Sequence, residues 1–266
     1  MSNLSLLVKN MNKSQEKIKD LFENTGRCYV IHYSCESFYD RTSTDSPRIT
    51  SIAVKNVESE QVTSFSIHLI AERNRTPVDL ITQNYDALET QMLQDFFYFV
   101  GAHTHVYWIH WKMRDNNYGF KAIEHRFSVL GGSPVIIPDN NKFDLSSLIH
   151  DIYGDNYAGH PRLPSLVKLN EITDMDFLTG AEEARAFDQG RYFDLHRSTL
   201  RKVDILQTIG TKAASGTLKT NSWAFRSVTM NILVIVERIQ KHWLTTLILF
   251  VAAILGLFTD VGNFLN

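Results

Sequence analysis

The chain has 266 residues, of which 44% are hydrophobic and 21% charged, and its net charge is −2. This length suits one large domain or two small ones, and the composition is that of an ordinary globular protein. The near-neutral charge excludes a general electrostatic attraction to nucleic acid, so any such contact must come from a local patch.

The N-terminal half predicts a helix followed by strands. Residues 5–24 carry apolar side chains at helical spacing and show no signal-peptide pattern. The run C-Y-V-I-H-Y at 28–33 predicts a buried strand, and 48–57 with 62–70 predict a hairpin. The only cysteines, Cys28 and Cys35, fall on opposite faces of one extended run, so we expect free thiols and a reducing compartment.

Helical patterns dominate the rest of the chain before its C-terminus. The helix expected after Thr179 opens with a capping box formed with Glu182. The expected helices are 84–100, 119–130, 145–153, 163–171, about 180–189 and 195–209, with a short buried strand at 106–109 and a loop at 131–142.

The C-terminus predicts a membrane segment. Residues 210–222 have a linker composition, and 224–240 form a strongly apolar helix. Trp243–Thr259 then holds no charge, and a helix of this length would be about 25 Å long. Basic residues just before it predict a single-pass anchor in the inner membrane with the N-terminal bulk in the cytoplasm. A buried core helix or an oligomer stalk is the alternative.

These elements predict an α/β protein in which helices flank a mixed sheet. The expected domains are an N-terminal helix at 1–24, an α/β domain at 25–209, the linker at 210–222 and the apolar C-terminal segment at 223–266. Three antiparallel strands, a helix, a short strand, a helix and further helices are the layout of the ribonuclease H-like fold.

Two motifs sharpen that likeness. The first strand leads into Ser34-Cys35-Glu36-Ser37, which resembles the Asp-x-Glu-Thr of metal-dependent 3′–5′ exonucleases of the ribonuclease H-like superfamily. Later, His110 and Asp115 keep the His-to-Asp interval of those enzymes, with Trp111 in place of their Asn. The resemblance covers roughly residues 28–209, and the chain is also similar to an uncharacterised bacterial group with W-x-H-W-x-M-R-D and S-T-L-R-K-V-D.

The resemblance implies a metal site. Two-metal phosphodiester cleavage needs carboxylates from separate elements around ions about 4 Å apart. Glu36, Asp115 and a late acid, Asp204 rather than Asp188, would hold Mg²⁺ or Mn²⁺ through oxygen ligands. Each acid also has an ordinary interpretation: Glu36 as a surface or capping carboxylate, Asp115 as a helix cap and Asp204 as an ion-pair partner of Arg201.

Two departures weigh against catalysis. Ser34 replaces the aspartate that, in the resembled family, bridges both metals. The base histidine five residues before the last aspartate is also absent, since Glu183 precedes Asp188 and Thr199 precedes Asp204 at that interval.

Basic and aromatic side chains near these motifs predict contacts to a single strand through stacking and phosphate binding. A solvated helix face is the ordinary alternative for the late residues. The predicted nucleic-acid contacts are His110, Trp111, Lys112, Arg114, Arg201 and Lys202.

Two functions follow from these patterns. The first is a degenerate exonuclease fold that binds a nucleic acid or a protein partner and couples it to the membrane helix. Antiphage effectors share that architecture, which is an analogy only. The second is an active Mg²⁺-dependent 3′–5′ exonuclease tethered to the membrane. Assembly into a homo-oligomer is left open by the sequence.

Overall fold

The computed structural model describes residues 3–23, 25–36, 46–114, 118–222, 246–248 and 250–251. The chain divides into two compact units, Met1–Thr220 and Asn221–Asn266, and each is treated by itself. In the second unit, residues 246–248 and 250–251 are helical. The predicted helix at 224–240 and most of the expected membrane segment lie outside the described residues.

The first unit alternates strands and helices over its whole length. Its elements are α1 (Asn3–Glu23), η1 (Thr25–Arg27), β1 (Cys28–Cys35), β2 (Ile49–Asn56), β3 (Val62–Ser66), α2 (Ile67–Arg73), η2 (Val78–Leu80), α3 (Tyr85–Ala102), β4 (Tyr107–His110), α4 (Phe120–Val129), η3 (Asp139–Asn141), β5 (Lys142–Asp144), α5 (Leu145–Tyr153), α6 (Arg162–Leu169), α7 (Gly180–Asp188) and α8 (Tyr192–Ala214). The predicted α/β class is confirmed.

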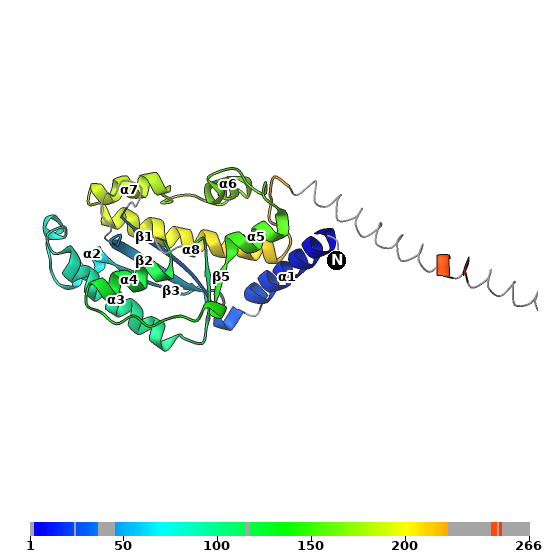
Figure 1. The fold of residues 1–266 in the computed structure, drawn as a ribbon. Coiled ribbons are helices and arrows are strands. Elements are labelled where there is room, and N and C mark those ends of the chain that lie inside the picture. The colour runs from blue at the N-terminus through cyan, green and yellow to red at the C-terminus, as the bar shows by residue number, and fades with distance from the viewer. Residues whose placement is uncertain are drawn as a thin grey trace, which may run out of the picture. The chain divides into compact units, whose positions relative to one another are not determined.

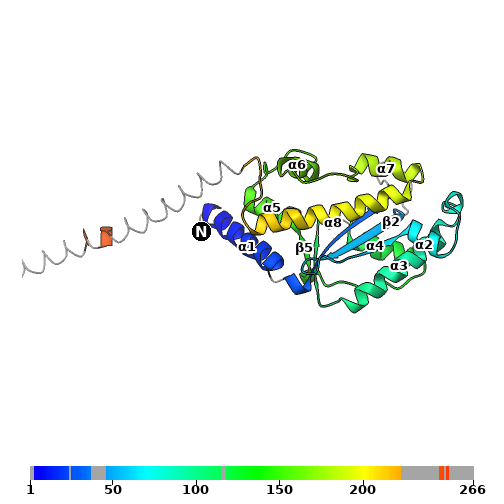
Figure 2. The same ribbon diagram turned by 180° about the vertical axis from the view of Figure 1, so that it is seen from behind.

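The strands form one mixed sheet in the order β3-β2-β1-β4-β5. β2 is antiparallel to β1 and β3, whereas β4 runs parallel to β1 and β5 runs parallel to β4. Figures 1 and 2 show the long helix α8 along one face of the sheet and the helices α3 and α4 on the other.

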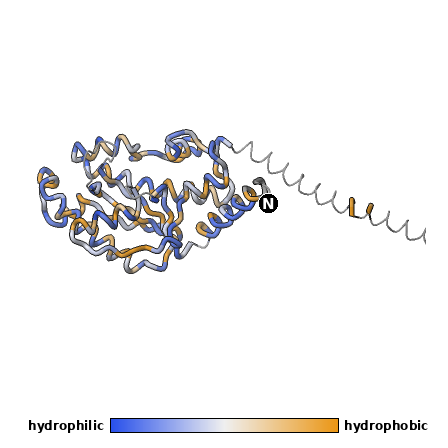
Figure 3. Tube along the Cα trace, viewed as in Figure 1, coloured by the Kyte–Doolittle hydropathy of each residue, from blue (hydrophilic) through white to orange (hydrophobic). Residues whose placement is uncertain are grey.

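Alternation along β1 creates two hydrophobic cores, one on each face. Ile31 and Tyr33 pack with α3 and α4, whereas Cys28 and Val30 pack with α1, α5 and α8. In Figure 3 hydrophobic and hydrophilic stretches alternate along the helices, as expected when one face of each helix covers a core. Because α1 contributes Ile18 and other side chains to the second core, it belongs to the same folded unit as the sheet.

The predicted third strand is shorter than expected. It pairs with β2 only as far as Ser66, and Ile67–Arg73 is a helix instead of the strand expected through Ile70. The buried residues of that helix are Ile67, Ile70 and Ala71, a spacing of three and four that belongs to a helix. Strand β5 was not predicted, because three residues at the end of a loop show no periodicity.

The expected linker begins inside a helix. α8 continues to Ala214, beyond the predicted end at 209, and Ala213 and Leu218 are buried. Gly210, which suggested a break in the sequence, is a packing position: an added Cβ would lie 1.9 Å from the ring of Phe22. Glycine here allows α8 and α1 to approach closely.

A buried ionic network fixes the start of β2 next to the end of β1. The Glu89 carboxylate is fully buried and accepts hydrogen bonds from the Ile49 main-chain N–H at 2.6 Å and from Arg126 Nε at 3.0 Å. Arg126 also pairs with Asp86 at 2.8 Å. Burial raises the pKa of Glu89, although Arg126 opposes this shift. The network joins α3 and α4 to the sheet at the place where β1 ends and β2 begins.

Candidate functional site

The carboxyl ends of β1, β4 and β5 lie at one edge of the sheet, because these three strands are parallel. Ligands of open α/β sheets commonly bind outside such an edge. β1 pairs with β4 only through Val30, so its last residues extend beyond β4. Tyr118 covers part of this extension: its hydroxyl donates to the Tyr33 carbonyl at 3.2 Å and its ring stacks on Tyr33.

Ser34 lies in a closed cluster of three hydroxyl groups. Its Oγ is 2.8 Å from Ser51 Oγ, which is 2.7 Å from Thr199 Oγ1, and all three residues are at most 2% exposed. Thr199 donates to the Leu195 carbonyl at 2.8 Å. Each hydroxyl has one hydrogen to donate. All three groups are satisfied when Ser34 donates to Ser51, Ser51 donates to Thr199, and Thr199 donates to the main chain of α8.

Glu36 follows this cluster and is half-buried. Its main-chain N–H donates to the Arg48 carbonyl at 2.8 Å, and its carboxylate accepts from the Arg48 N–H at 3.3 Å. This side chain therefore helps to hold the end of β1 against the start of β2. Asp115, the second predicted metal ligand, lies outside the described residues.

Asp204 does not approach Glu36. Its carboxylate pairs with Lys55 Nζ at 2.8 Å and with Arg201 at 3.9 Å. Lys55 faces Val30 across β1 and β2, and Glu36 lies six residues further along, about 20 Å at the rise of a strand. Because α8 runs antiparallel to β1, the α8 residue that reaches Ser34 is Thr199. Asp188, the alternative ligand, is exposed at the end of α7.

Sequence reasoning missed a buried ion pair beside the end of β1. Glu183 Oε1 lies 2.6 Å from Lys202 Nζ and accepts a hydrogen bond from Ser198 Oγ at 2.9 Å. Burial raises the pKa of the Cys35 thiol, and the nearby charges of Glu183 and Glu36 raise it further. Helix α7, which carries Glu183, packs against β1. The sequence signal was its position five residues before Asp188, where the resembled family has a histidine.

His32 lies on the same face of β1 as Ser34 and is buried. Neither of its ring nitrogens has a hydrogen-bond partner among the described residues. Burial, together with the charge of Lys202, lowers its pKa well below the usual value, so the ring is neutral.

The predicted nucleic-acid contacts fall into two groups. His110, Trp111 and Lys202 are buried, so Trp111 presents no open face for stacking. Arg201 is half-buried and donates to the Met175 carbonyl at 3.0 Å. Lys112 and Arg114 face solvent, and Arg114 pairs with Asp144, the last residue of β5. Only the loop after β4 thus offers exposed cations from this set.

A pocket of about 290 Å³ opens at the carboxyl ends of β4 and β5. His110 is buried in its wall and accepts a hydrogen bond from the Met113 N–H through Nδ1 at 3.1 Å. Burial lowers the pKa of His110 to about 4, although Asp144 opposes this shift. The lining residues are His110, Met113, Arg114, Phe120, Lys121, Asp139, Lys142 and Asp144.

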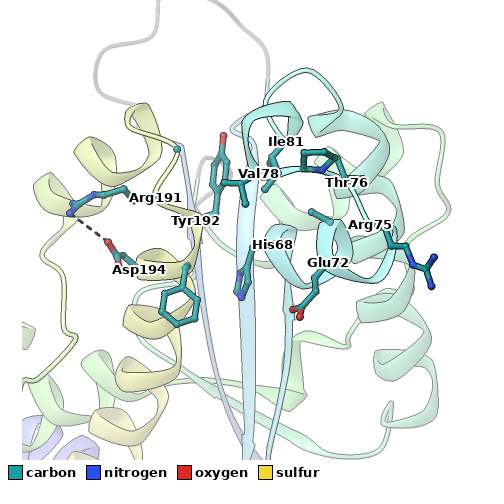
Figure 4. A pocket seen from close by; sticks show the side chains of 13 residues that line it. His68, Glu72, Arg75, Thr76, Val78, Ile81, Arg191, Tyr192 and Asp194 are labelled. Atoms are coloured by element: carbon teal, nitrogen blue, oxygen red, sulfur yellow. Dashed lines mark ion pairs between the residues drawn. The ribbon is translucent and has the colours of Figure 1, made fainter.

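A larger pocket of about 720 Å³ lies between the α2–η2 segment and the start of α8 (Figure 4). Its wall includes His68, Val78, Ile81 and Tyr192, and Figure 4 shows Arg191 turned away from it toward Asp194. Charged groups at its rim carry both signs, so its lining does not select a ligand by charge.

Within the part of the chain that the structure describes, no cluster of three or more His, Cys, Asp or Glu side chains could hold a metal ion. A search of the same residues finds no helix with the length and apolar character that crossing a bilayer requires. The roles of Asp115 and of the tail therefore stay predictions. Family models, curated proteins and solved structures were each compared with the chain, and none matches it.

Proposed function

We propose that this chain is a catalytically degenerate exonuclease-fold protein that binds a single-stranded nucleic acid, or else a protein partner, at the carboxyl edge of its sheet. The layout of the elements supports the fold: three antiparallel strands, the helices α2 and α3, the parallel strand β4, the helix α4, a second parallel strand β5 and, after further helices, the long helix α8 across the sheet. The C-terminal apolar segment would tether the domain to the inner membrane and would respond to the bound ligand.

The closed hydroxyl cluster of Ser34, Ser51 and Thr199 carries the proposal. Ser34 stands where the resembled enzymes have their bridging aspartate, and its hydroxyl is used up in contacts with β2 and α8. Mg²⁺ binds charged oxygen ligands and keeps several waters, whereas these hydroxyls are neutral and buried. A binding domain tolerates this replacement, but two-metal cleavage loses a ligand of both ions.

The test compares binding with cleavage. The full-length chain is incubated with labelled oligonucleotides and Mg²⁺ or Mn²⁺, and both bound and degraded strands are measured. We expect binding without degradation in the wild type and in Glu36→Ala and Asp115→Ala. Glu16→Ala, an exposed acid on α1, is the control. Divalent-dependent degradation that disappears in Glu36→Ala, but not in the control, would overturn the proposal.

That outcome would instead support the second function, an active Mg²⁺-dependent 3′–5′ exonuclease. One observation favours it: Glu36, which stands where the resembled enzymes have their glutamate, is half-buried rather than enclosed. The membrane part of the proposal has its own test. A chain that ends near residue 222 should lose membrane attachment and any antiphage protection. Unchanged fractionation and protection in cells would contradict the coupling.

A further inference from the structure

The side chains that line the small pocket at the ends of β4 and β5 offer mainly hydrogen-bond donors and few free acceptors. Asp144 lines it, but both of its oxygens are engaged: one accepts from the Lys112 and Ser146 N–H groups, and the other from Ser147 and Arg114. The remaining acid, Asp139, is highly exposed at the rim. Among the described lining residues, neither carboxylate is therefore left free at the inner wall.

His110 contributes a donor from the buried wall. Because Nδ1 accepts the Met113 N–H, the neutral ring carries its hydrogen on Nε2. Nε2 has no hydrogen-bond partner within the described ranges, and the residue is 2% exposed. The imidazole packs edge-on against Phe120, which fixes its orientation in the pocket.

Cations and a helix end surround this donor. Lys142 Nζ lies 5.1 Å from the centre of the Phe120 ring and pairs with Asp139, while Lys121 is exposed and has no ion pair in the described part of the chain. Both residues belong to the lining, as does Arg114. Phe120 and Lys121 also begin α4, whose N-cap is Gly119 and has no side chain to cap the first N–H groups. Such an end favours an anion.

We propose that this pocket binds a phosphomonoester group, and that its source is the terminal phosphate of a single strand. A phosphomonoester offers three acceptor oxygens and a charge near −2, which suits donors converging from His110, Lys121, Lys142 and the start of α4. A volume of about 290 Å³ exceeds the needs of a bare ion and leaves room for the attached sugar. This inference rests on the proposed nucleic-acid function and names the group that the edge would recognise.

The experiment measures binding to the full-length chain by fluorescence anisotropy. The probes are one labelled oligonucleotide with a 5′-phosphate, a 3′-phosphate or hydroxyls at both ends, with inorganic phosphate as a separate ligand in calorimetry. We expect one of the phosphorylated strands to bind about tenfold more tightly than the hydroxyl-ended strand, or about 1.4 kcal/mol. The double variant Lys121→Gln/Lys142→Gln should remove that difference.

A matched double variant, Lys9→Gln/Lys168→Gln, removes the same charge from exposed sites on α1 and α6 and should keep the preference. Equal binding of all three strands would overturn the phosphate pocket and leave the proposed function intact. Binding of inorganic phosphate that needs Lys121 and Lys142, with no strand bound, would support the pocket and overturn the nucleic-acid function. A preference that both double variants lose equally would reflect net charge and would overturn the assignment to this pocket.

Discussion

The end of β1 and the ends of β4 and β5 share one edge of the sheet but use polar residues in opposite ways. At β1 the hydroxyls of Ser34, Ser51 and Thr199 satisfy one another and exclude solvent. At β4 and β5 the donors of His110 and two lysines face an open pocket. The first arrangement supports the fold, and the second is available to a ligand.

The difference separates stability from binding along a single edge. A buried polar group that is fully satisfied contributes to stability and has nothing left to offer a ligand. A donor that lacks a partner costs stability until a ligand supplies one. Substitutions in the hydroxyl cluster should therefore change the free energy of unfolding, and substitution of the two lysines at the other end should change binding. His110 is the exception at that end, because it is buried and its protonation costs stability.

The largest effect is expected for Ser34→Asp, which inserts a carboxylate into the closed cluster. Burying a charge without a partner costs about 3–5 kcal/mol, so the free energy of unfolding in urea should fall by about that amount. The loss should shrink as pH falls toward the pKa of an unfolded aspartate, because the protonated side chain carries no charge. Ser34→Ala, which adds no charge, is the control and should lose much less.

Repeating this unfolding measurement with Mg²⁺ tests whether the cluster can hold a metal ion. If 10 mM Mg²⁺ leaves the Ser34→Asp variant as unstable as before, the cluster is closed to metal. Full recovery of stability with Mg²⁺ would instead mean that this end of the sheet still holds an ion, and the comparison between the two ends would fail.

The next effect is acid destabilisation through His110. Burial lowers the pKa of His110 to about 4, whereas its pKa in the unfolded chain is near 6.5. Between about pH 6.5 and pH 4 the imidazole is therefore protonated in the unfolded chain but not in the folded one. Stability is thus complete above about pH 6.5 and is lost as pH falls, by about 3 kcal/mol for this residue. Urea titrations at pH 7, 5.5 and 4 should show a shallower decline in His110→Gln. The exposed His125→Gln, on α4, serves as control, and an equal slope in all three proteins would refute the assignment.

A smaller loss is expected at the centre of the cluster. Thr199→Val keeps the shape of the side chain but leaves the Ser51 hydroxyl without its acceptor in the arrangement that satisfies all three groups. We expect about 1–2 kcal/mol less stability, since a buried donor loses its partner. Thr208→Val on the same helix removes a half-buried hydroxyl whose one partner among the described residues is the Asp204 carbonyl. A loss no larger than that of this control would mean that the cluster adds little.

Much of the fold could be predicted because the spacing of apolar residues along a strand or helix shows which of its faces is buried. The strands at β1 and β2 and the helices α3, α4, α5 and α7 were expected close to their observed positions, and the capping box at Thr179 is present. Short or composite patterns were misjudged. Val62–Ile70 changes from strand to helix at Ser66, and Gly210 marks a close contact with Phe22 rather than a flexible linker.

The candidate site was harder to predict because it depends on the register of α8 against β1. Sequence order suggested that a late acid would reach the end of β1, and Asp204 was preferred. The antiparallel course of α8 instead brings Thr199 to Ser34 and leaves Asp204 opposite Lys55. The Glu183–Lys202 pair joins residues on different helices, and no spacing rule in the sequence links them.

The smallest stability effect is expected at the open pocket, where Lys121→Gln/Lys142→Gln removes the exposed charge of Lys121 and the charge of Lys142, whose side chain is 12% exposed. Lys121 has no ion pair among the described residues, and the acid that meets Lys142 is exposed and therefore screened. We expect the urea midpoint without ligand to stay within error of the wild type.

Phosphate should nevertheless raise the wild-type midpoint, because a ligand that binds only the folded state stabilises it by about 2.7 kcal/mol at 100 times its Kd. The double variant should lose that gain. The opposite result would be a double variant whose urea midpoint shifts without ligand but still rises normally with phosphate. It would contradict the assignment of stability to the end of β1 and of binding to the ends of β4 and β5.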